Sequence, residues 1–374
     1  MTSKGAKGAS TVQRPLLKDE FFSPAVVRSL ADGLSSLRTN FHAKDFSAFV
    51  LQGWDELELK ARMRRISTGF RQFLPRDYAT AVGILERLAP QVRGFAGMVF
   101  PDFVEVYGTE HYERSIRSLE FFTTLSSSEF AVRPFLRQYG HKMEQQMLVW
   151  AGNENHHVRR LASEGFRPRL PWAAPLPHLQ QDPTPILPVL ERLRDDPSDY
   201  VRRSVANNLN DISKDHPDLV VRIAQEWKND SPLRTALLRH ACRTLLKSGR
   251  QDALAIFGQA RTTSIDVTSF AASHSSIPIG SSVQLFAVLQ NTSKSPVHVR
   301  VSYAVHFRRP GDKASRKVFA WKIVDIKPKG MLQLEKKHAF AQLSTRKHYE
   351  GPHDIHIIVN GVDMSSIVVD LTTP

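Results

Sequence analysis

The segment Asn153–Trp172, NENHHVRRLASEGFRPRLPW, brings a helical pattern, several cations, one acid and one aromatic residue together in a short stretch. Apolar residues such as Val158 and Leu161 recur at helical spacing, so one face of the segment can be buried. Arg160 and Glu164, four residues apart, share another face. The glycine and prolines that follow end the helix and place the terminal tryptophan in a rigid turn. Taken alone, the segment also fits an intrahelical ion pair at the end of a core helix.

The same pattern recurs at two later places in the chain. Residues 196–218 read DPSDYVRRSVANNLNDISKDHPD, and residues 230–249 read DSPLRTALLRHACRTLLKSG. Units of about 40 residues that open with a turn and continue as an amphipathic helix are typical of HEAT-type helical repeats. Because equivalent positions of stacked repeats line one concave face, Glu164 and Asp211 are predicted to face the same groove.

The composition limits the class of partner. The 374 residues carry a formal net charge of +14, which favours a polyanion such as nucleic acid or an anionic membrane surface. No apolar run is long enough to span a membrane, and no signal peptide is recognisable, so we expect no membrane insertion. The single cysteine, Cys242, excludes a disulfide framework and is predicted to be a buried structural thiol in a cytoplasmic protein.

Periodicity divides the chain into three predicted parts. Residues 1–18 have little that can pack and are predicted to form a disordered basic tail. Residues 19–262 follow a helical period and are predicted to form a HEAT-like α-solenoid. Residues 263–374 contain short alternating or apolar runs separated by turn residues, which predicts an all-β, immunoglobulin-like domain, although the chain lacks the usual cysteine pair. Asn360 and Gly361 predict a hairpin turn within it.

The sequence lacks the motifs that indicate several common kinds of catalytic site. His156 and His157 are adjacent, so they do not point at one ion, and no HExxH or CxxC spacing supplies further metal ligands. A GxSxG nucleophile and phosphate-binding glycine motifs are also missing. What remains is a basic surface with a few acids and an aromatic residue. Such acids suit a cationic reacting centre, as in cleavage of the N-glycosidic bond of an alkylated base, where carboxylates stabilise positive charge and orient water. An indole adds cation–π attraction to the charged base.

Three stretches carry a family resemblance. ENHHVRRLASEGFRPRLPW, with SEFAVRPFL before it and DYVRRSVANNLNDISKDHPD after it, resembles the HEAT-like DNA alkylation repair glycosylases of the AlkD superfamily, in particular the AlkC branch. The order of a HEAT-like domain followed by an immunoglobulin-like domain is similar to that branch. The resemblance implies a monofunctional glycosylase that acts on double-stranded DNA as a monomer. It would excise N3-alkylated bases, 3-methyladenine and 3-methylcytosine, without metal or cofactor.

The resemblance also implies roles for individual residues. The acids that face the lesion correspond to Glu129, Glu164 and Asp211, and the aromatic residue near the lesion corresponds to Trp172. Asp211 is expected to supply electrostatic stabilisation and to orient water, while the two glutamates act on the cationic base and sugar. Glu129 follows three serines at a predicted helix start, so favouring the helix dipole is its alternative role. The candidate phosphate contacts, each of which can instead pair with a helix acid, are Arg159, Arg160, Arg202, Arg203 and Arg239.

Two questions stay open at the level of the sequence. HEAT arrays are often adaptors, so the alternative function is a non-catalytic scaffold that binds nucleic acid or an acidic protein. The basic turn at residues 308–317 either reaches phosphate or is a solvated hairpin. Neutralising the predicted acids separates the two functions, because a scaffold should tolerate the change and a glycosylase should not.

Overall fold

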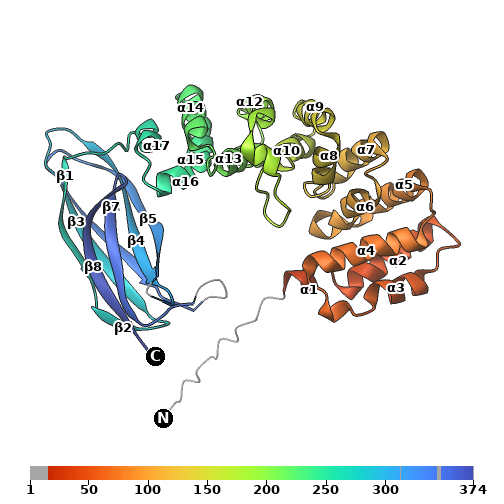
Figure 1. Ribbon diagram of the computed structural model, residues 1–374, viewed down its shortest axis with the longest axis horizontal. Coiled ribbons are helices and arrows are strands. Elements are labelled where there is room, and N and C mark those ends of the chain that lie inside the picture. Colours follow the sequence, from red (N-terminus) through yellow and green to blue (C-terminus); the bar gives the residue numbers. More distant parts are fainter. Residues whose placement is uncertain (1–15, 312, 343–346, 374) are drawn as a thin grey trace, which may run out of the picture. The chain divides into compact units, whose positions relative to one another are not determined.

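The computed structural model describes residues 16–311, 313–342 and 347–373. The chain forms two compact units, Met1–Asn208 and Leu209–Pro374, called here the first and the second unit. Helices come first and an all-β domain follows, as the ribbon in Figure 1 shows. The predicted fold class is therefore confirmed. Most of the tail predicted for residues 1–18 lies outside the described residues, and the first helix already begins at Leu17.

The first unit is built of short helices that follow one another in chain order. Their bounds are α1 Leu17–Phe21, α2 Pro24–Leu37, α3 Ala43–Leu51, α4 Leu59–Phe73, α5 Tyr78–Leu88, α6 Val99–Tyr107, α7 Tyr112–Thr123, α8 Val132–Tyr139, α9 His141–Trp150, α10 His156–Glu164, α11 Pro177–Gln181 and α12 Leu187–Leu193. Short 3₁₀ turns lie at Trp54–Glu56, Ala89–Gln91, Gly94–Met98 and Thr184–Ile186. Each main helix packs on close neighbours in the sequence, for example α4 on α6, α6 on α7, and α9 on α10. This local pairing is the packing expected of helical repeats.

Polar residues at the helix starts fix where several of these helices begin. The Ser23 side chain accepts a hydrogen bond from the Val26 amide at 3.4 Å at the start of α2. The Asp77 carboxylate accepts from the Thr80 amide at 2.8 Å at the start of α5. The Asn155 side chain accepts from the His157 amide at 2.8 Å and begins α10, which carries part of the candidate site. These caps satisfy amides that have no partner within the helix.

A file of stacked aromatic rings runs through the core of the first unit. The rings of Phe46, Phe70, Phe100 and Phe122 follow one another at centroid distances of 5.8, 6.0 and 5.7 Å. They come from α3, α4, α6 and α7, so the file joins four helices. All four side chains are buried, and truncating one such phenylalanine typically costs about 3–5 kcal/mol. These four phenylalanines are therefore core, as the sequence predicts.

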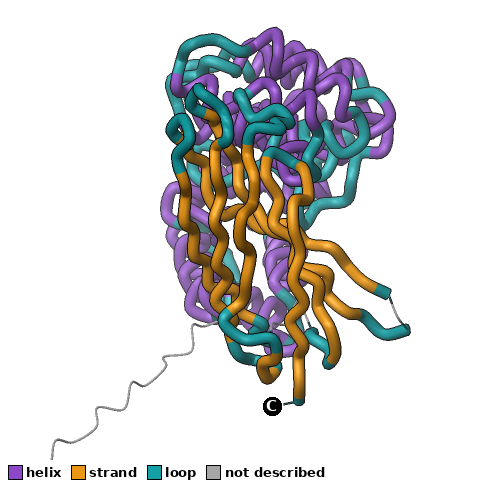
Figure 2. The backbone as a smooth tube through the Cα atoms, turned by 90° about the vertical axis from the view of Figure 1, so that its left-hand side faces the viewer, coloured by secondary structure: helices purple, strands orange, loops and turns teal. Residues whose placement is uncertain are grey.

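The second unit joins the last helices to a β-sandwich. The helix α13 (Asp199–Ile212) contains the boundary between the units, and α14 Pro217–Trp227, α15 Pro232–Ala241, α16 Arg243–Lys247 and α17 Gln251–Ile256 follow. The strands are β1 Ile265–Ala272, β2 Ser276–Pro278, β3 Ser282–Asn291, β4 Val297–Arg308, β5 Ala314–Ile326, β6 Met331–Ala339, β7 Gly351–Val359 and β8 Val362–Thr372. They form one sheet with the order β1-β3-β6 and another with the order β2-β8-β7-β4-β5. Figure 2 shows these strands running side by side.

The core of the sandwich lies between the two sheets, where alternate residues of the strands face inward. Leu285 of β3, Val305 of β4 and Ile355 of β7 belong to one buried cluster. The strands β7 and β8 pair as a hairpin whose turn is Asn360 and Gly361, with φ of +47° and +78°. Positive φ at both central residues is what a type I′ turn requires, so the predicted hairpin turn is confirmed. Cys242 is a free, buried thiol, as predicted.

Candidate functional site

The candidate site of the first unit starts at the end of α10. Glu164 is the last residue of this helix and is buried. Its Oε1 accepts from Arg167 Nη1 at 2.6 Å and lies 3.6 Å from Arg160 Nη2. The last turn of α10 is also tied down by Asn208 of α13, whose amide nitrogen donates to the Ser163 carbonyl at 2.9 Å. Packing and two cations therefore fix this carboxylate in place.

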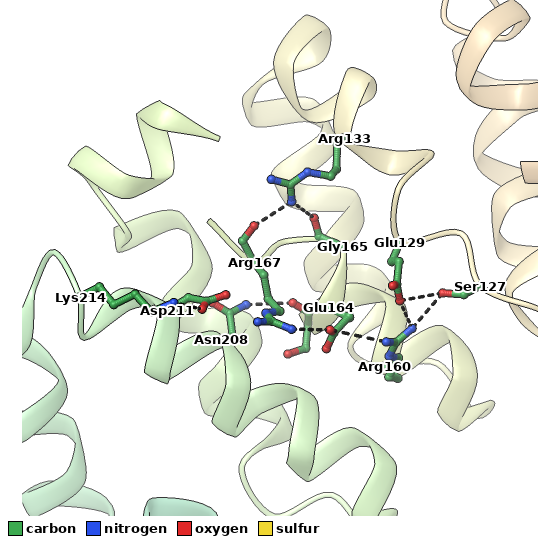
Figure 3. Close-up of polar contacts among 11 residues, drawn as sticks. Ser127, Glu129, Arg133, Arg160, Glu164, Gly165, Arg167, Asn208, Asp211 and Lys214 are labelled. Atoms are coloured by element: carbon green, nitrogen blue, oxygen red, sulfur yellow. Dashed lines mark hydrogen bonds and ion pairs between the residues drawn. The ribbon is translucent and has the colours of Figure 1, made fainter. Parts of the chain in front are cut away.

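A second carboxylate, Glu129, reaches the same cation. It forms an ion pair with Arg160, and the Ser127 hydroxyl donates to Glu129 Oε2 at 2.9 Å and accepts from Arg160 Nη1 at 2.9 Å. Figure 3 shows Arg160 between the two glutamates. Burial acts to lower the pKa of Arg160, but the negative charges of Glu129 and Glu164 together raise it above its usual value. Arg160 is thus held as a cation between two carboxylates, Glu129 and Glu164, that are 35 residues apart in the sequence.

The predicted helix start at Glu129 was wrong by three residues. The serines are followed by a turn, and α8 begins only at Val132. Glu129 therefore lies before the helix and not in its first turn. The N-cap residue of α8 is Ala131, without a side-chain cap, and the Ser128 hydroxyl donates to the Leu119 carbonyl at 2.8 Å. Glu129 thus lies ahead of the first turn of α8, and the contacts observed for its carboxylate are those with Arg160 and Ser127.

Arg133 of α8 organises the loop that follows α10. It is almost fully buried, at 2% exposure. Its Nη1 donates to the Arg167 carbonyl at 2.7 Å and to the Gly165 carbonyl at 3.3 Å, while Nε and Nη2 donate to the Ala174 carbonyl at 3.1 and 2.7 Å. One guanidinium thus holds both ends of the loop, as Figure 3 shows in part. Sequence reasoning missed this residue, although an arginine inside the apolar pattern of VRPFL was a signal.

The same loop presents Trp172 to solvent. Its side chain is 58% exposed, and its backbone has a φ of +63°. The Trp172 carbonyl accepts from Lys60 Nζ at 2.8 Å, and the indole meets the edge of the Phe95 ring at a centroid distance of 6.3 Å. The predicted aromatic residue therefore lies on the surface of the first unit, in the loop that follows Glu164.

Tyr200, which the sequence analysis did not select, lies next to the ion-paired cluster. Its ring is 5.0 Å from the Arg160 guanidinium and 5.9 Å from the ring of His157. Partial burial raises the pKa of the phenol, and the positive charge of Arg160 opposes this shift. The ring is nevertheless 44% exposed. An aromatic residue directly before the repeated VRR pattern was the available signal for it.

Asp211, the third predicted acid, belongs to the second unit. It is 1% exposed, near the end of α13, and its Oδ1 lies 3.0 Å from Lys214 Nζ. The neighbouring Asn210 side chain accepts from the Thr244 amide at 3.2 Å and from the Thr244 hydroxyl at 2.9 Å, which ties this end of α13 to α16. Asp211 and Glu164 belong to different units, so it stays a prediction that these two acids face a common groove.

The five predicted arginines divide into three groups. Arg159 forms a two-point pair with Asp196, at 2.5 and 3.0 Å, and Arg202 donates to the Asp196 carbonyl at 2.6 Å, so both are occupied with the turn before α13. Arg160 is shared between the two glutamates. Arg203 is largely exposed and pairs with Asp199 at 2.7 Å on the surface, and Arg239 of the second unit lies over the Phe257 ring at 4.9 Å. Pairing with acids, the alternative considered for each of them, is therefore observed for Arg159, Arg160, Arg202 and Arg203, since Arg202 Nη2 also lies 3.4 Å from Asp199 Oδ1.

A basic cleft of about 830 Å³ lies within the second unit, between α16 and the strands β4 and β5. Arg316 pairs with Asp363 at 2.8 Å. Burial, and next the positive charge of Arg239, lower the pKa of Arg300. A negative charge bound beside Arg300 would therefore stabilise its charged form. The basic residues that line the cleft are Arg243, Lys247, Arg300, Arg316 and Lys317. The sequence pointed to the last two of them, in the basic turn, but not to the cations of α16.

The described parts of the chain give no indication of a metal centre or a membrane segment. Among the residues described, no three or more His, Cys, Asp or Glu side chains gather in a way that could hold a metal ion. Each helix among them is too short or too polar to cross a bilayer.

The helical fold followed by an immunoglobulin-like sandwich matches a class of DNA repair protein. Residues 50–245 match the family described as "DNA alkylation repair enzyme", and the chain belongs to this family. Residues 266–373 match a second family, described as the C-terminal Ig-like domain of the uncharacterised protein YhaZ. The resemblance inferred from the sequence is confirmed.

Two individual proteins are similar to this chain over most of their lengths. One is the Pseudomonas fluorescens alkylpurine DNA glycosylase AlkC, solved bound to DNA containing an abasic site analog. It is 34% identical, the match covers 96% of this chain and 100% of AlkC, and the TM-score is 0.94. The other is the uncharacterized protein YhaZ of Bacillus subtilis (strain 168), which is 42% identical over 343 residues, 91% of this chain and 96% of YhaZ.

Proposed function

We propose that this protein is a monofunctional DNA glycosylase that hydrolyses the N-glycosidic bond of cationic N3-alkylated bases, 3-methyladenine and 3-methylcytosine, in double-stranded DNA. The observation that carries the proposal is the pair of carboxylates, Glu129 and Glu164, fixed by buried guanidinium groups in a strongly basic protein. Acids inside a polyanion-binding surface repel phosphate, so their presence there needs a reason beyond the ion pairs with Arg160 and Arg167, such as stabilising a cationic substrate. An alkylated base is such a cation.

The chemistry requires negative charge and not an acid catalyst. When the bond between C1′ and the base nitrogen breaks, its electron pair leaves with the base, so the cationic base departs as a neutral molecule. Positive charge then develops on the deoxyribose, and the oxygen of water bonds to C1′. In the proposal, Asp211 stabilises that charge and takes up the proton that the water loses, while Glu129 and Glu164 stabilise the cationic base and sugar. The product is an abasic site.

The exposed indole of Trp172 is the proposed contact to the damaged base. A cation over an aromatic face gains about 0.5–2 kcal/mol, more when water is excluded. Trp172 is accessible and lies in the loop that follows Glu164. This arrangement favours charged over neutral bases, because an undamaged base has no positive charge for either the indole or the carboxylates to stabilise.

Phosphate binding is assigned to cations that are accessible. We include Arg203, Arg239 and the basic cleft of the second unit in the proposed DNA interface, since this part of the protein offers several cations and few acids. Arg159 and Arg202 direct their donors to protein acceptors, so we assign them a supporting role at the start of α13. Arg160 supports the two glutamates.

Release of methylated bases from alkylated DNA tests the proposal. The wild-type protein should release 3-methyladenine and 3-methylcytosine, detected by chromatography, and Asp211→Asn and Glu164→Gln should each lower the rate by about two to three decades. Glu154→Gln is the matched control, because Glu154 is an exposed glutamate in the turn before α10. If the wild-type protein binds DNA but releases no base, the scaffold function replaces the enzyme. If all variants release base at the same rate, the assigned carboxylates are wrong.

A further inference from the structure

Trp172 occupies a backbone position that normally selects glycine. The Ala173 amide donates to the Leu170 carbonyl at 3.2 Å, which closes a turn with Pro171 and Trp172 at its two central positions. Proline at the first and a positive φ at the second are the features of a type II turn, in which the second position is usually glycine. A bulky side chain with a φ of +63° is strained there. Strain of this kind persists only where surrounding contacts hold it.

Lys60, the second residue of α4, supplies such a contact from a distant part of the chain. Its Nζ donates to the Trp172 carbonyl at 2.8 Å and lies 4.8 Å from the centre of the Phe130 ring. A hydrogen bond from an ammonium group is stronger than one between neutral groups. Phe130 is buried and follows Glu129 directly. Lys60 therefore bridges the Trp172 turn and the segment that carries one of the glutamates.

The indole itself has few contacts that could hold it. It contacts the ring of Phe95, which packs in turn against Phe21 at a centroid distance of 4.7 Å and Phe22 at 5.8 Å. With more than half of Trp172 exposed, packing holds the ring only on one side, so the position of the indole depends on the backbone conformation, which sets the direction of the Cα–Cβ bond. The backbone of this loop is held by buried Arg133 at its two ends and by Lys60 at the tryptophan.

We propose that Lys60 is a positioning residue: by holding the Trp172 carbonyl, its ammonium group keeps the turn in its strained form and keeps the indole directed for contact with the cationic base. This inference rests on the proposed glycosylase function. Lys60 does not touch the reacting atoms. Its loss should therefore reduce the rate of base release much more than the affinity for undamaged DNA.

The variant that tests this is Lys60→Met, which keeps an unbranched apolar side chain over Phe130 and removes the ammonium. We expect a single-turnover release rate about tenfold lower, the value of one charge-assisted hydrogen bond, with Lys60→Arg restoring the rate to within about threefold. Lys44→Met is the matched control, because Lys44 is the exposed second residue of α3 as Lys60 is of α4. It removes the same charge and should leave the rate unchanged.

A double-variant cycle separates positioning from a general structural effect. If Lys60 acts through the indole, Lys60→Met should have no further effect on the rate in a Trp172→Ala background. Losses that multiply in the double variant, or a Lys60→Met protein as active as the Lys44→Met protein, would overturn the inference. Thermal unfolding of each variant, with no drop expected for these exposed lysines, shows that the proteins compared are folded.

A spectroscopic measurement tests the same idea without enzyme activity. The fluorescence of Trp172 is obtained by subtracting the emission of a protein with the Trp172→Phe substitution from the emission of the same protein without it. In the Lys60→Met background this difference signal should become more accessible to quenching by acrylamide, and in the Lys44→Met background it should not. Equal quenching in both backgrounds would contradict the positioning role of Lys60. Absence of base release by the wild-type protein, in contrast, refutes the proposed function while this quenching result still stands.

Discussion

Removing Arg160 should destabilise the first unit more than removing the glutamate that it pairs with. The side chains of Arg160, Glu129 and Glu164 are 13%, 16% and 7% exposed. In Arg160→Gln, two nearly buried carboxylates lose their shared cation, and breaking a buried pair in this way costs about 3 kcal/mol. Glu164 keeps Arg167 and Glu129 keeps Ser127, which limits the loss. In Glu129→Gln, Arg160 still has Glu164 nearby, so we expect a smaller loss of about 1.5 kcal/mol.

The double variant Arg160→Gln/Glu129→Gln provides the decisive comparison. With both charges of the pair removed, the free energy of unfolding should fall by about 3 kcal/mol and not by the sum of about 4.5, because the coupling of about 1.5 kcal/mol is lost only once. Urea unfolding followed by far-UV circular dichroism measures these values, with the exposed Glu154→Gln protein as the control. Losses that add to within about 0.5 kcal/mol would refute the view that Arg160 joins the two segments as one ion-paired unit.

Three further outcomes follow from the contacts described. Arg159→Met should lower the free energy of unfolding by about 3 kcal/mol, because it leaves the buried Asp196 carboxylate without its two-point partner. Arg203→Met should leave the free energy of unfolding within about 0.5 kcal/mol of the wild type. Comparable losses for the two variants in urea unfolding would contradict this difference. Lys247→Gln should reduce the slope of log affinity for duplex DNA against log salt concentration by about 0.9, and an unchanged slope in fluorescence anisotropy would remove this lysine from the interface. Burial, with a smaller effect of the nearby Asp252 charge, raises the pKa of the Cys242 thiol to about 12; it should therefore stay protonated and resist iodoacetamide at neutral pH until urea unfolds the protein, and rapid alkylation of the folded protein would show that it is accessible.

The candidate site was only partly predictable from the sequence, and its residues show why. Arg160 and Glu164 share a helix face by their spacing, so their proximity could be anticipated. That Glu129 binds the same guanidinium could not, because the two segments meet only when α8 and α10 pack near one another. The predicted start of α8 was also wrong: Ser128 resembles a helix cap, but the N-cap residue is Ala131, and the Ser128 hydroxyl donates to the Leu119 carbonyl of the preceding helix.

By itself, the sequence determined the parts of this protein that depend on neighbours along the chain. Helical spacing in the first two thirds, alternation in the last third, and the Asn360–Gly361 turn each reflect local backbone preference and the need to bury one face. Tertiary structure alone decided the contacts that join distant segments: Arg133 on the loop after α10, Lys60 on the carbonyl of Trp172, and the cations of α16 beside those of β5. These depend on where whole helices and strands pack, and no local period of the sequence encodes that.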